Sequence, residues 1–340
     1  MTPTDVAAGA APTLEMVARL AGVSRSTVSR VVNDSPKVTA DVVAAVNTAI
    51  EQLGYVPNRA ARSLASRRTH AIALVIPENT AKFFADPYFA SVIQGAAMYL
   101  AGTDYTLSLL IASESDSEKT RRYLQGGNVD GALILSHHSD DRSYVQLARR
   151  LPVVFGGRPM SQEGPDSFYV DVDNVAAARQ ATQYLIDHGK TRIATISGPH
   201  NMAAGLDRLE GWRTALGDAG LAAELHEEGD FTPPGGAAAM RRLLDRGQPF
   251  DALFAASAQM ASGALIALRE RGLRVPEDVG VVTIDNDYYA QNAVPPLTTI
   301  DQPSAVQGSK IAEVLVRLIN GEDVPKRTII PTSLVERASV

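Results

Sequence analysis

From residue 71 onward the chain alternates short apolar runs with longer amphipathic stretches, and this alternation constrains the fold most strongly. Such alternation is typical of βαβ units, whose strands lie parallel in one sheet. The expected strands are Ala71–Ile76, Thr106–Ile111, Gly131–Leu135, Val153–Phe155, Arg192–Ser197, Ala252–Ala256 and Val279–Ile284. The expected helices include Pro87–Ala101, Val175–His188, Leu206–Ala219, Met260–Arg271 and Ser304–Asn320. The sequence therefore predicts an α/β fold with parallel sheets.

A weak internal repeat suggests that this α/β part consists of two similar lobes. Thr69 followed by Ile72 and Ala73 opens one series of elements, and Thr191 followed by Ile193 and Ala194 opens a second about 120 residues later. Ligands of such sheets bind outside the carboxyl ends of the strands. Candidate binding residues are therefore expected just after the strands.

Charge is distributed unevenly along the chain. The formal net charge is −6, from 32 basic and 38 acidic residues. Residues 1–70 contain eight of the basic and five of the acidic residues, so the remaining 270 carry 24 basic and 33 acidic groups. A small basic head on an acidic body is the asymmetry of a DNA-binding unit joined to something else. A merely solvated basic surface is the alternative.

The basic head has the pattern of two short helices joined by a tight glycine turn. The second helix, Arg25–Val32, has polar residues near its start and valines that can face inward. This arrangement matches a recognition helix that enters a major groove. A third helix is expected over about Ala40 to Leu53. The expected capping and turn residues are Thr13, Gly22, Ser24, Thr39 and Gly54.

Several protein classes are excluded by composition. The 340 residues include no cysteine, so disulfide scaffolds, thiolate zinc sites and cysteine nucleophiles are absent. Residues 1–12 have no signal-peptide pattern, and we expect them to form a disordered tail. No apolar stretch approaches the roughly 20 residues that span a membrane. We expect a cytoplasmic protein with no cofactor and no membrane partner.

Two long segments resemble a known family. They read TLEMVARLAGVSRSTVSRVVN, from Thr13 to Asn33, and QLGYVPNRAARSL, from Gln52 to Leu64. In length, order and spacing they resemble the LacI family of bacterial transcription regulators, and the resemblance covers nearly the whole chain. It implies an N-terminal all-α helix-turn-helix head and a two-lobed, periplasmic-binding-protein-like body. Met16 departs from the usual acid, on the outer face of the first helix.

The resemblance also implies which residues touch DNA. The positions that match the family's base readers are Arg25, Ser26 and Arg30, and those that mostly touch phosphates are Thr27, Asn33 and Lys37. An arginine can donate two hydrogen bonds to guanine, which gives roughly 1–3 kcal/mol of discrimination. The implied partner is a palindromic double-stranded DNA operator, read by a homodimer.

Residues 58–68 match the hinge helix of the family, which includes the DNA contacts Asn58 and Arg59. Leu64 matches the leucine that these proteins push between central base pairs from the minor groove. A helix this short is unstable alone in water, so folding coupled to DNA binding is implied. A linker helix with a buried leucine is the alternative.

The resemblance divides the chain into a head at 13–57, the hinge at 58–68 and a body at 69–340. The body chain of this family crosses between its lobes three times, here near Val172, Asp301 and Pro331. Lobe one therefore comprises about 69–172 and 302–330, and lobe two about 173–301 and 331–340. An effector that closes the cleft between the lobes offers a hinge mechanism for switching.

The candidate effector-binding residues follow from the same resemblance and are Asp86, Tyr88, Phe89, Arg208, Trp212 and Asp285. Carboxylate, guanidinium and aromatic groups together suit a sugar, which has paired hydroxyls and apolar ring faces. For Trp212, the only tryptophan, the alternative is that it packs its helix onto the sheet. Tyr288 and Tyr289 can be either cleft rings or loop surface.

Two departures from the family bear on the ligand. The segment ENTAKFFA between Pro77 and Asp86 is longer than usual and resembles actinobacterial regulators of cellobiose and β-glucoside genes. Ser257 and Ala258 replace a common Asn-Asp pair, which removes polar contacts to other ligands. The preferred effector is cellobiose or another short β-linked glucose oligomer, and the expected function is a repressor that this sugar releases.

An enzymatic role is not expected. The sequence contains no G-x-S-x-G elbow, P-loop, G-x-G-x-x-G or H-E-x-x-H motif. The adjacent pair His137-His138 points to opposite faces of a strand end, which disfavours a shared metal. The alternatives are a sugar receptor of a transport system, a regulator that responds to a different sugar, and one that uses its ligand as a corepressor.

Overall fold

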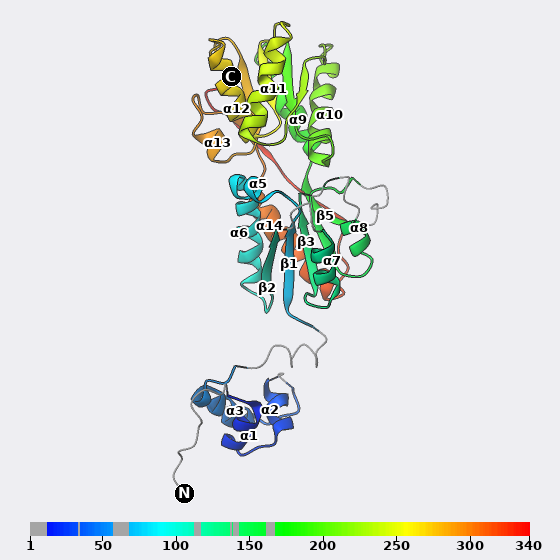
Figure 1. Ribbon diagram of the computed structural model, residues 1–340, viewed down its shortest axis with the longest axis vertical. Coiled ribbons are helices and arrows are strands. Elements are labelled where there is room, and N and C mark those ends of the chain that lie inside the picture. The colour runs from blue at the N-terminus through cyan, green and yellow to red at the C-terminus, as the bar shows by residue number, and fades with distance from the viewer. Residues whose placement is uncertain are drawn as a thin grey trace. The chain divides into compact units, whose positions relative to one another are not determined.

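The structure is a computed structural model that describes residues 12–32, 35–56, 68–111, 117–136, 138, 143–160 and 167–340. The chain forms two compact units, Met1–His70 and Ala71–Val340 (Figure 1). Apart from Pro12 and Arg68, the expected tail and hinge lie outside the described residues. In the described ranges, no helix combines the length and apolar character needed to cross a bilayer.

The described residues of the first unit form the helices α1 (Leu14–Leu20), α2 (Arg25–Val32) and α3 (Ala40–Leu53). The Thr13 hydroxyl accepts a hydrogen bond from the Met16 N–H at 3.4 Å, and the Ser24 hydroxyl accepts one from the Thr27 N–H at 3.1 Å. These bonds satisfy amide groups that the first turn of a helix leaves unpaired. The predicted helix starts are therefore confirmed for α1 and α2.

The turns of this unit require residues with unusual backbone conformations. Gly22 and Gly54 have φ of 68° and 60°, which glycine adopts without a steric penalty. Thr39 precedes α3, but its side chain makes no capping hydrogen bond, so that expected contact was wrong. Apolar side chains from all three helices form one core, which includes Val17, Val28 and Val46.

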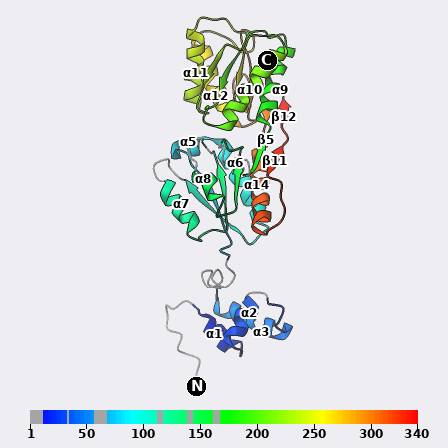
Figure 2. The ribbon, with the colours of Figure 1, turned by 90° about the vertical axis from the view of Figure 1, so that its right-hand side faces the viewer.

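The second unit contains two sheets with helices on both faces of each, so the predicted α/β fold class is confirmed (Figures 1 and 2). The first lobe contains β1 (Ala71–Ile76), α5 (Thr80–Ala85), α6 (Pro87–Leu100), β2 (Thr106–Ile111), α7 (Ser117–Gln125), β3 (Gly131–Leu135), α8 (Ser143–Leu147), β4 (Val153–Gly156), β5 (Phe168–Val172), α14 (Ser304–Ile319) and β11 (Arg327–Ile330). Its strands are all parallel, in the order β11-β5-β4-β3-β1-β2.

The second lobe contains α9 (Asn174–Asp187), β6 (Ile193–Ser197), α10 (Ala203–Asp218), β7 (His226–Glu228), α11 (Pro233–Asp245), β8 (Ala252–Ala255), α12 (Ala258–Glu270), β9 (Gly280–Ile284), α13 (Tyr288–Gln291), β10 (Thr298–Asp301) and β12 (Ser333–Val335). The strand order is β12-β10-β9-β8-β6-β7, and only the β10–β12 pair is antiparallel. Figure 2 shows α11 and α12 on one face of this sheet and α9 and α10 on the other.

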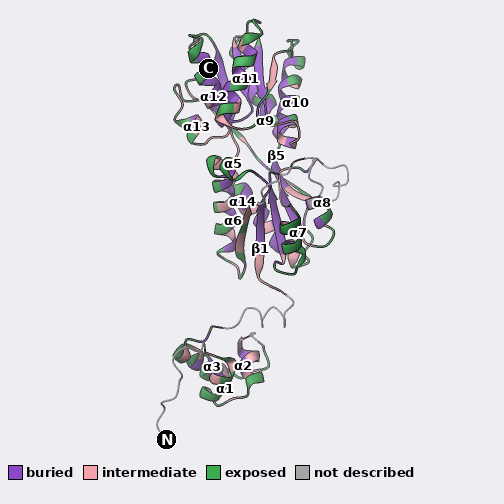
Figure 3. Ribbon diagram, in the orientation of Figure 1, coloured by how far each residue is buried: buried purple, intermediate pink, exposed green. Residues whose placement is uncertain are grey.

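Each sheet is buried between its two helical layers. The central strands β1, β3, β8 and β9 consist almost entirely of buried residues, and the exposed residues lie on the outer faces of the helices (Figure 3). Strands β1 and β6, which begin the two halves of the internal repeat, occupy the same place in their sheets, next to an edge strand. Because helices cover both faces of each sheet, both faces are apolar, as is typical of parallel sheets.

The chain passes between the lobes three times. It leaves the first sheet after Val172, returns after Asp301 and passes to the second sheet again between Ile330 and Ser333. Because the three connections lie side by side, the lobes form one unit and their strand ends face each other (Figure 1). This topology creates the cleft in which the candidate effector-binding residues lie.

Candidate functional site

Helix α2 presents a polar surface to solvent. Its buried residues, Val28 and Val31, face the core, and this places Arg25, Ser26 and Arg30 on the exposed side. The side chain of Arg25 is 72% exposed, and its Nε lies 3.1 Å from Glu15 Oε1 of α1. An exposed helix with this pattern has the chemistry needed to contact base edges in a major groove.

The start of α2 is organised by hydroxyl groups. The Ser24 hydroxyl lies 2.8 Å from both the Ser26 and Thr27 hydroxyls. Lys37, in the loop before α3, is exposed. The other DNA-contact candidates, Asn33, Asn58, Arg59 and Leu64, lie outside the described residues, and their roles remain predictions.

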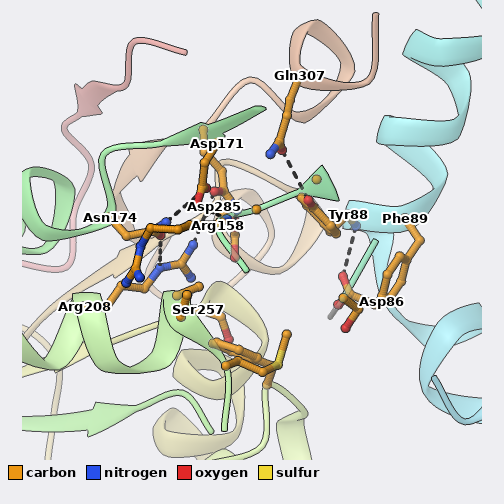
Figure 4. Close-up of a pocket in the computed structure, with 18 of the residues that line it drawn as sticks. Asp86, Tyr88, Phe89, Arg158, Asp171, Asn174, Arg208, Ser257, Asp285 and Gln307 are labelled. Atoms are coloured by element: carbon orange, nitrogen blue, oxygen red, sulfur yellow. Dashed lines mark hydrogen bonds between the residues drawn. The ribbon is translucent and has the colours of Figure 1, made fainter. Parts of the chain in front are cut away.

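A pocket lies between the two lobes of the second unit, at the carboxyl ends of strands from both sheets. It has about 870 Å³ of space when the open solvent at its mouth is included. The candidates Asp86, Tyr88, Phe89, Arg208 and Asp285 all line it (Figure 4). The structure therefore brings five of the six predicted effector residues together.

Trp212 is the exception and requires a correction. It lies one helical turn beyond Arg208 on α10, is fully buried and packs with Leu209 and Phe254 in the core of lobe two. One turn displaces a residue about 5.4 Å along the axis, which carries Trp212 away from the cleft and over the sheet. The ring that lines the pocket from this lobe is instead Phe231.

Arg208 is fixed by contacts from three directions. Its Nε donates to Asn174 Oδ1 at 2.8 Å, its Nη1 to the Ala256 carbonyl at 2.6 Å, and its Nη2 to Gln302 Oε1 at 3.3 Å. The guanidinium carbon lies 5.7 Å from the centre of the Phe231 ring. The residue is 5% exposed, so the charge is held rigidly at the pocket wall.

Backbone strain is concentrated at this pocket. Four non-glycine residues of the described ranges have a left-handed φ, and three of them, Ser136, Phe231 and Asp285, line the pocket. Such conformations cost about 1–3 kcal/mol each and persist where the surroundings enforce them, often at functional sites. Asp285 also accepts a hydrogen bond from the Gln302 amide.

The first lobe contributes the start of α6. Asp86 caps this helix by accepting a hydrogen bond from the Tyr88 N–H at 2.9 Å. The Tyr88 hydroxyl donates to Gln307 Oε1 of α14 at 3.2 Å, and Phe89 packs in the lobe core with one side on the pocket. Figure 4 shows Asp86, Tyr88 and Phe89 together on one side of the pocket, apart from Arg208 and Asn174.

Carboxyl groups that face each other across the cleft have perturbed pKa values. Burial, together with the charges of Asp285 and Asp287, raises the pKa of Asp86 to about 7, although the Tyr88 N–H opposes this. Burial and the Asp285 charge raise the pKa of Asp287 to about 6. Burial also raises the pKa values of Asp171 and Asp285. Burial in the cleft thus makes the charged forms of these carboxyl groups costly, although each accepts at least one hydrogen bond.

The unusual ENTAKFFA segment forms α5 and builds a polar cluster around Glu78. One oxygen of this carboxylate lies 3.1 Å from Lys82 Nζ and 2.9 Å from His138 Nε2, and it accepts a hydrogen bond from Ser136 at 2.5 Å. Burial alone raises the pKa of Glu78, but these three partners lower it to about 2. Because Lys82 and Ser136 line the pocket, the segment shapes one wall of it.

Other pocket residues escaped the sequence analysis, notably Arg158, Asp171, Asn174 and Gln302. Arg158 follows the predicted strand Val153–Phe155 at its carboxyl end, so a survey of all predicted strand ends would have found it. Gln302 follows β10, a strand that the sequence did not predict, and the same survey would have missed it. The described residues contain no cluster of three or more metal-binding side chains, and His137 lies outside them.

Residues 13–58 match the family described as bacterial regulatory proteins, lacI family, and residues 182–340 match the periplasmic binding protein-like domain. The chain is 47% identical over 333 residues to the HTH-type transcriptional regulator CelR of Thermobifida fusca, a match that covers 96% of this chain and 98% of CelR.

Two solved structures share the fold over nearly the full length. One, described as a transcriptional regulator CelR-cellobiose complex, has a TM-score of 0.77 and 46% identity and covers 97% of this chain and 100% of its own. The other, the lac repressor dimer bound to operator and the anti-inducer ONPF, has a TM-score of 0.85 and 27% identity and covers 97% and 99%. These similarities concern regulators, and none of the proteins is named as an enzyme.

Proposed function

Because the chain belongs to the LacI family of bacterial regulatory proteins, we propose that it represses sugar-utilisation genes and is released from DNA by a short β-linked glucose oligomer, with cellobiose preferred. It binds a palindromic operator as a homodimer, because a two-fold protein matches a two-fold site. The observation that carries the proposal is the ring-lined polar pocket between the lobes.

The chemistry of this pocket suits a neutral sugar. Asp86, Asp171 and Asp285 offer acceptors to hydroxyl groups, and Arg208 offers a fixed donor. The rings of Tyr88, Phe89 and Phe231 provide faces for the apolar sides of sugar rings. Two other cations of the pocket, Lys82 and Arg158, are already paired with Glu78 and Asp207. An anionic ligand would meet uncompensated carboxylates, and this favours an uncharged effector.

The similarity to CelR supports the choice of cellobiose. The related CelR structure is described as a complex with that sugar, and CelR resembles this chain over almost its whole length. The α5 segment, which supplies Lys82 to the pocket, is the part of the sequence that resembles β-glucoside regulators.

In the proposed mechanism the sugar binds both lobes and closes the cleft. Closure shifts the lobe nearest the hinge, separates the two hinge segments of the dimer and withdraws Leu64 from the operator. The sugar must prefer the low-affinity state, and a hundredfold loss of DNA affinity requires about 2.7 kcal/mol of preference.

The test is fluorescence anisotropy of a labelled palindromic duplex, selected from a random pool, titrated with the protein at one fixed salt concentration. Salt is fixed because phosphate contacts make the affinity depend steeply on ionic strength. We expect cellobiose, but not glucose, to release the DNA. Tight DNA binding that cellobiose does not change would refute cellobiose as the effector. Tighter DNA binding in the presence of cellobiose would indicate that the sugar is a corepressor. Failure to prefer any palindrome over random DNA would refute the proposed operator binding.

A further inference from the structure

One ion pair joins the two lobes across the cleft. Arg158 follows β4 in lobe one, Asp207 lies on α10 in lobe two, and Arg158 Nη2 is 2.6 Å from Asp207 Oδ1. Among the ion pairs of the described residues, the others connect groups within one unit or one lobe. The Asp207 side chain is only 21% exposed, so this pair is better shielded than most surface pairs.

Both ends of the pair are connected to residues that line the pocket. The Arg158 N–H donates to Asp171 Oδ2 at 2.8 Å, Asn174 Nδ2 donates to Asp171 Oδ1 at 3.1 Å, and Arg208 donates to Asn174 Oδ1. Asp207 precedes Arg208 on the same helix turn. Figure 4 shows Arg158, Asp171, Asn174 and Arg208 gathered on one side of the pocket. A ring of contacts thus runs from one lobe to the other and back.

We propose that Asp207 is a positioning residue for the effector pocket: it holds Arg158 across the cleft and thereby keeps the lobes in the arrangement that completes the pocket. Arg158 lines the pocket, whereas Asp207 is not among its lining residues and acts through Arg158. The assignment of the pocket to a sugar effector rests on the proposed function, but the contact between the lobes does not.

The proposal predicts effects as large as those expected from the loss of a single ion pair. Loss of a partly exposed pair changes an equilibrium roughly two- to fivefold, and salt weakens the pair. Asp207→Asn should therefore loosen the lobes in the ligand-free chain and weaken cellobiose binding by that factor. Raising the salt concentration should bring the wild-type chain toward the behaviour of the variant.

The chain has no cysteine, so labels can be placed specifically. Arg122→Cys on α7 and Arg213→Cys on α10, both exposed, carry spin labels whose separation reports on the two lobes. The separation is measured in the full chain with Asp207→Asn, with Arg158→Gln and with both. The matched control is Asp218→Asn, which breaks the 2.9 Å pair between Arg179 and Asp218 inside lobe two.

We expect each cleft variant to lengthen or broaden the distance distribution, the double variant to add nothing further, and the control to match wild type. The proposal is overturned if Asp207→Asn behaves like Asp218→Asn, if the two cleft variants add, or if salt acts equally on wild type and Asp207→Asn. A wild-type chain that does not bind cellobiose would refute the proposed effector, while the label distances would still decide the role of Asp207.

Discussion

Arg208 illustrates how one side chain can serve both the stability and the ligand chemistry of the pocket. Its three hydrogen bonds connect α9, the end of β8 and the connection after β10. A rigid, buried donor of this kind does not need to be ordered when a ligand arrives, and this reduces the entropic cost of binding.

We predict that Arg208→Ala weakens cellobiose binding roughly ten- to hundredfold, because a charged hydrogen-bond donor is worth about 1.5–3 kcal/mol. DNA affinity should be unchanged, since Arg208 lies outside the first unit. Calorimetric titration with the sugar and anisotropy with the operator measure the two effects. Arg213→Ala, an exposed residue of the same helix, is the control, and an undiminished sugar response in Arg208→Ala would remove Arg208 from the site.

Glu78 and Asp86 lie on either side of α5, and they should make the free energy of unfolding depend on pH in opposite directions. Asp86 has its pKa raised from 3.8 to about 7, so its contribution is complete below pH 3.8 and is lost as the pH rises through about 7. Glu78 has its pKa lowered from 4.5 to about 2, so its contribution is present above pH 4.5 and is lost as the pH falls through about 2.

We therefore expect Asp86→Asn to flatten the fall in unfolding free energy between about pH 4 and 7, and Glu78→Gln to flatten the fall below pH 4.5. Urea unfolding is followed by fluorescence of Trp212, the only tryptophan, which is fully buried in the second unit. Profiles of the two variants that remain parallel to wild type would contradict these assignments.

At the scale of elements, the pairing of α6 and α14 depends on glycine. A Cβ at Gly308 would lie 2.0 Å from the Val92 carbonyl oxygen, and one at Gly95 would lie 1.8 Å from the Ala305 carbonyl oxygen. The two helix backbones therefore touch, which fixes α6 and places Asp86, Tyr88 and Phe89 at the pocket.

Gly308→Ala should lower the free energy of unfolding by roughly 1–3 kcal/mol, because an overpacked contact forces the helices apart. The control is Gly217→Ala in α10, where a Cβ would meet nothing within 4 Å. Gly217→Ala should raise the free energy of unfolding by about 0.4–1 kcal/mol, because alanine has less conformational freedom than glycine in the unfolded chain. Urea denaturation separates the two, and equal effects in both variants would refute the packing argument.

One prediction concerns the hinge at 58–68 and rests on the sequence resemblance alone. Leu64→Ala should weaken binding to the selected palindrome, because the wedge sustains a bend in the DNA. Unstacking the base step costs roughly a few kcal/mol, and the bend repays this cost through additional protein contacts. Sugar affinity and binding to random DNA should be retained. Anisotropy on both duplexes provides the measurement, and an equal loss on the two would exclude the wedge.

At the scale of the whole molecule, the two units have separate cores and separate chemistry. A chain that begins at residue 69 should bind cellobiose with unchanged affinity and lose operator binding, because it keeps every pocket residue and lacks α2. Calorimetry and anisotropy on the shortened chain test this. Retained operator binding would show that the DNA contacts do not lie in the first unit.

The sequence by itself determined the local structure. Strands β1, β2 and β3 have the predicted bounds, and the ends of the predicted helices agree within three residues, because periodicity and capping act over a few neighbouring residues. The short strands β5, β7, β10, β11 and β12 were missed. Of these, β5 contains Asp and β10 contains Asp and two Thr residues, so both lack the continuous apolar run of a buried strand.

Only the tertiary structure decided which side chains share the pocket. Asp86 and Asp285 lie almost 200 residues apart, and they meet because the chain crosses between the sheets three times and brings strand ends together. The same topology buries Trp212 and exposes Phe231 to the cleft, although helical spacing places Trp212 on the face of Arg208. Spacing along one helix specifies direction around its axis, whereas depth beneath the cleft depends on where the sheet and the opposite lobe lie.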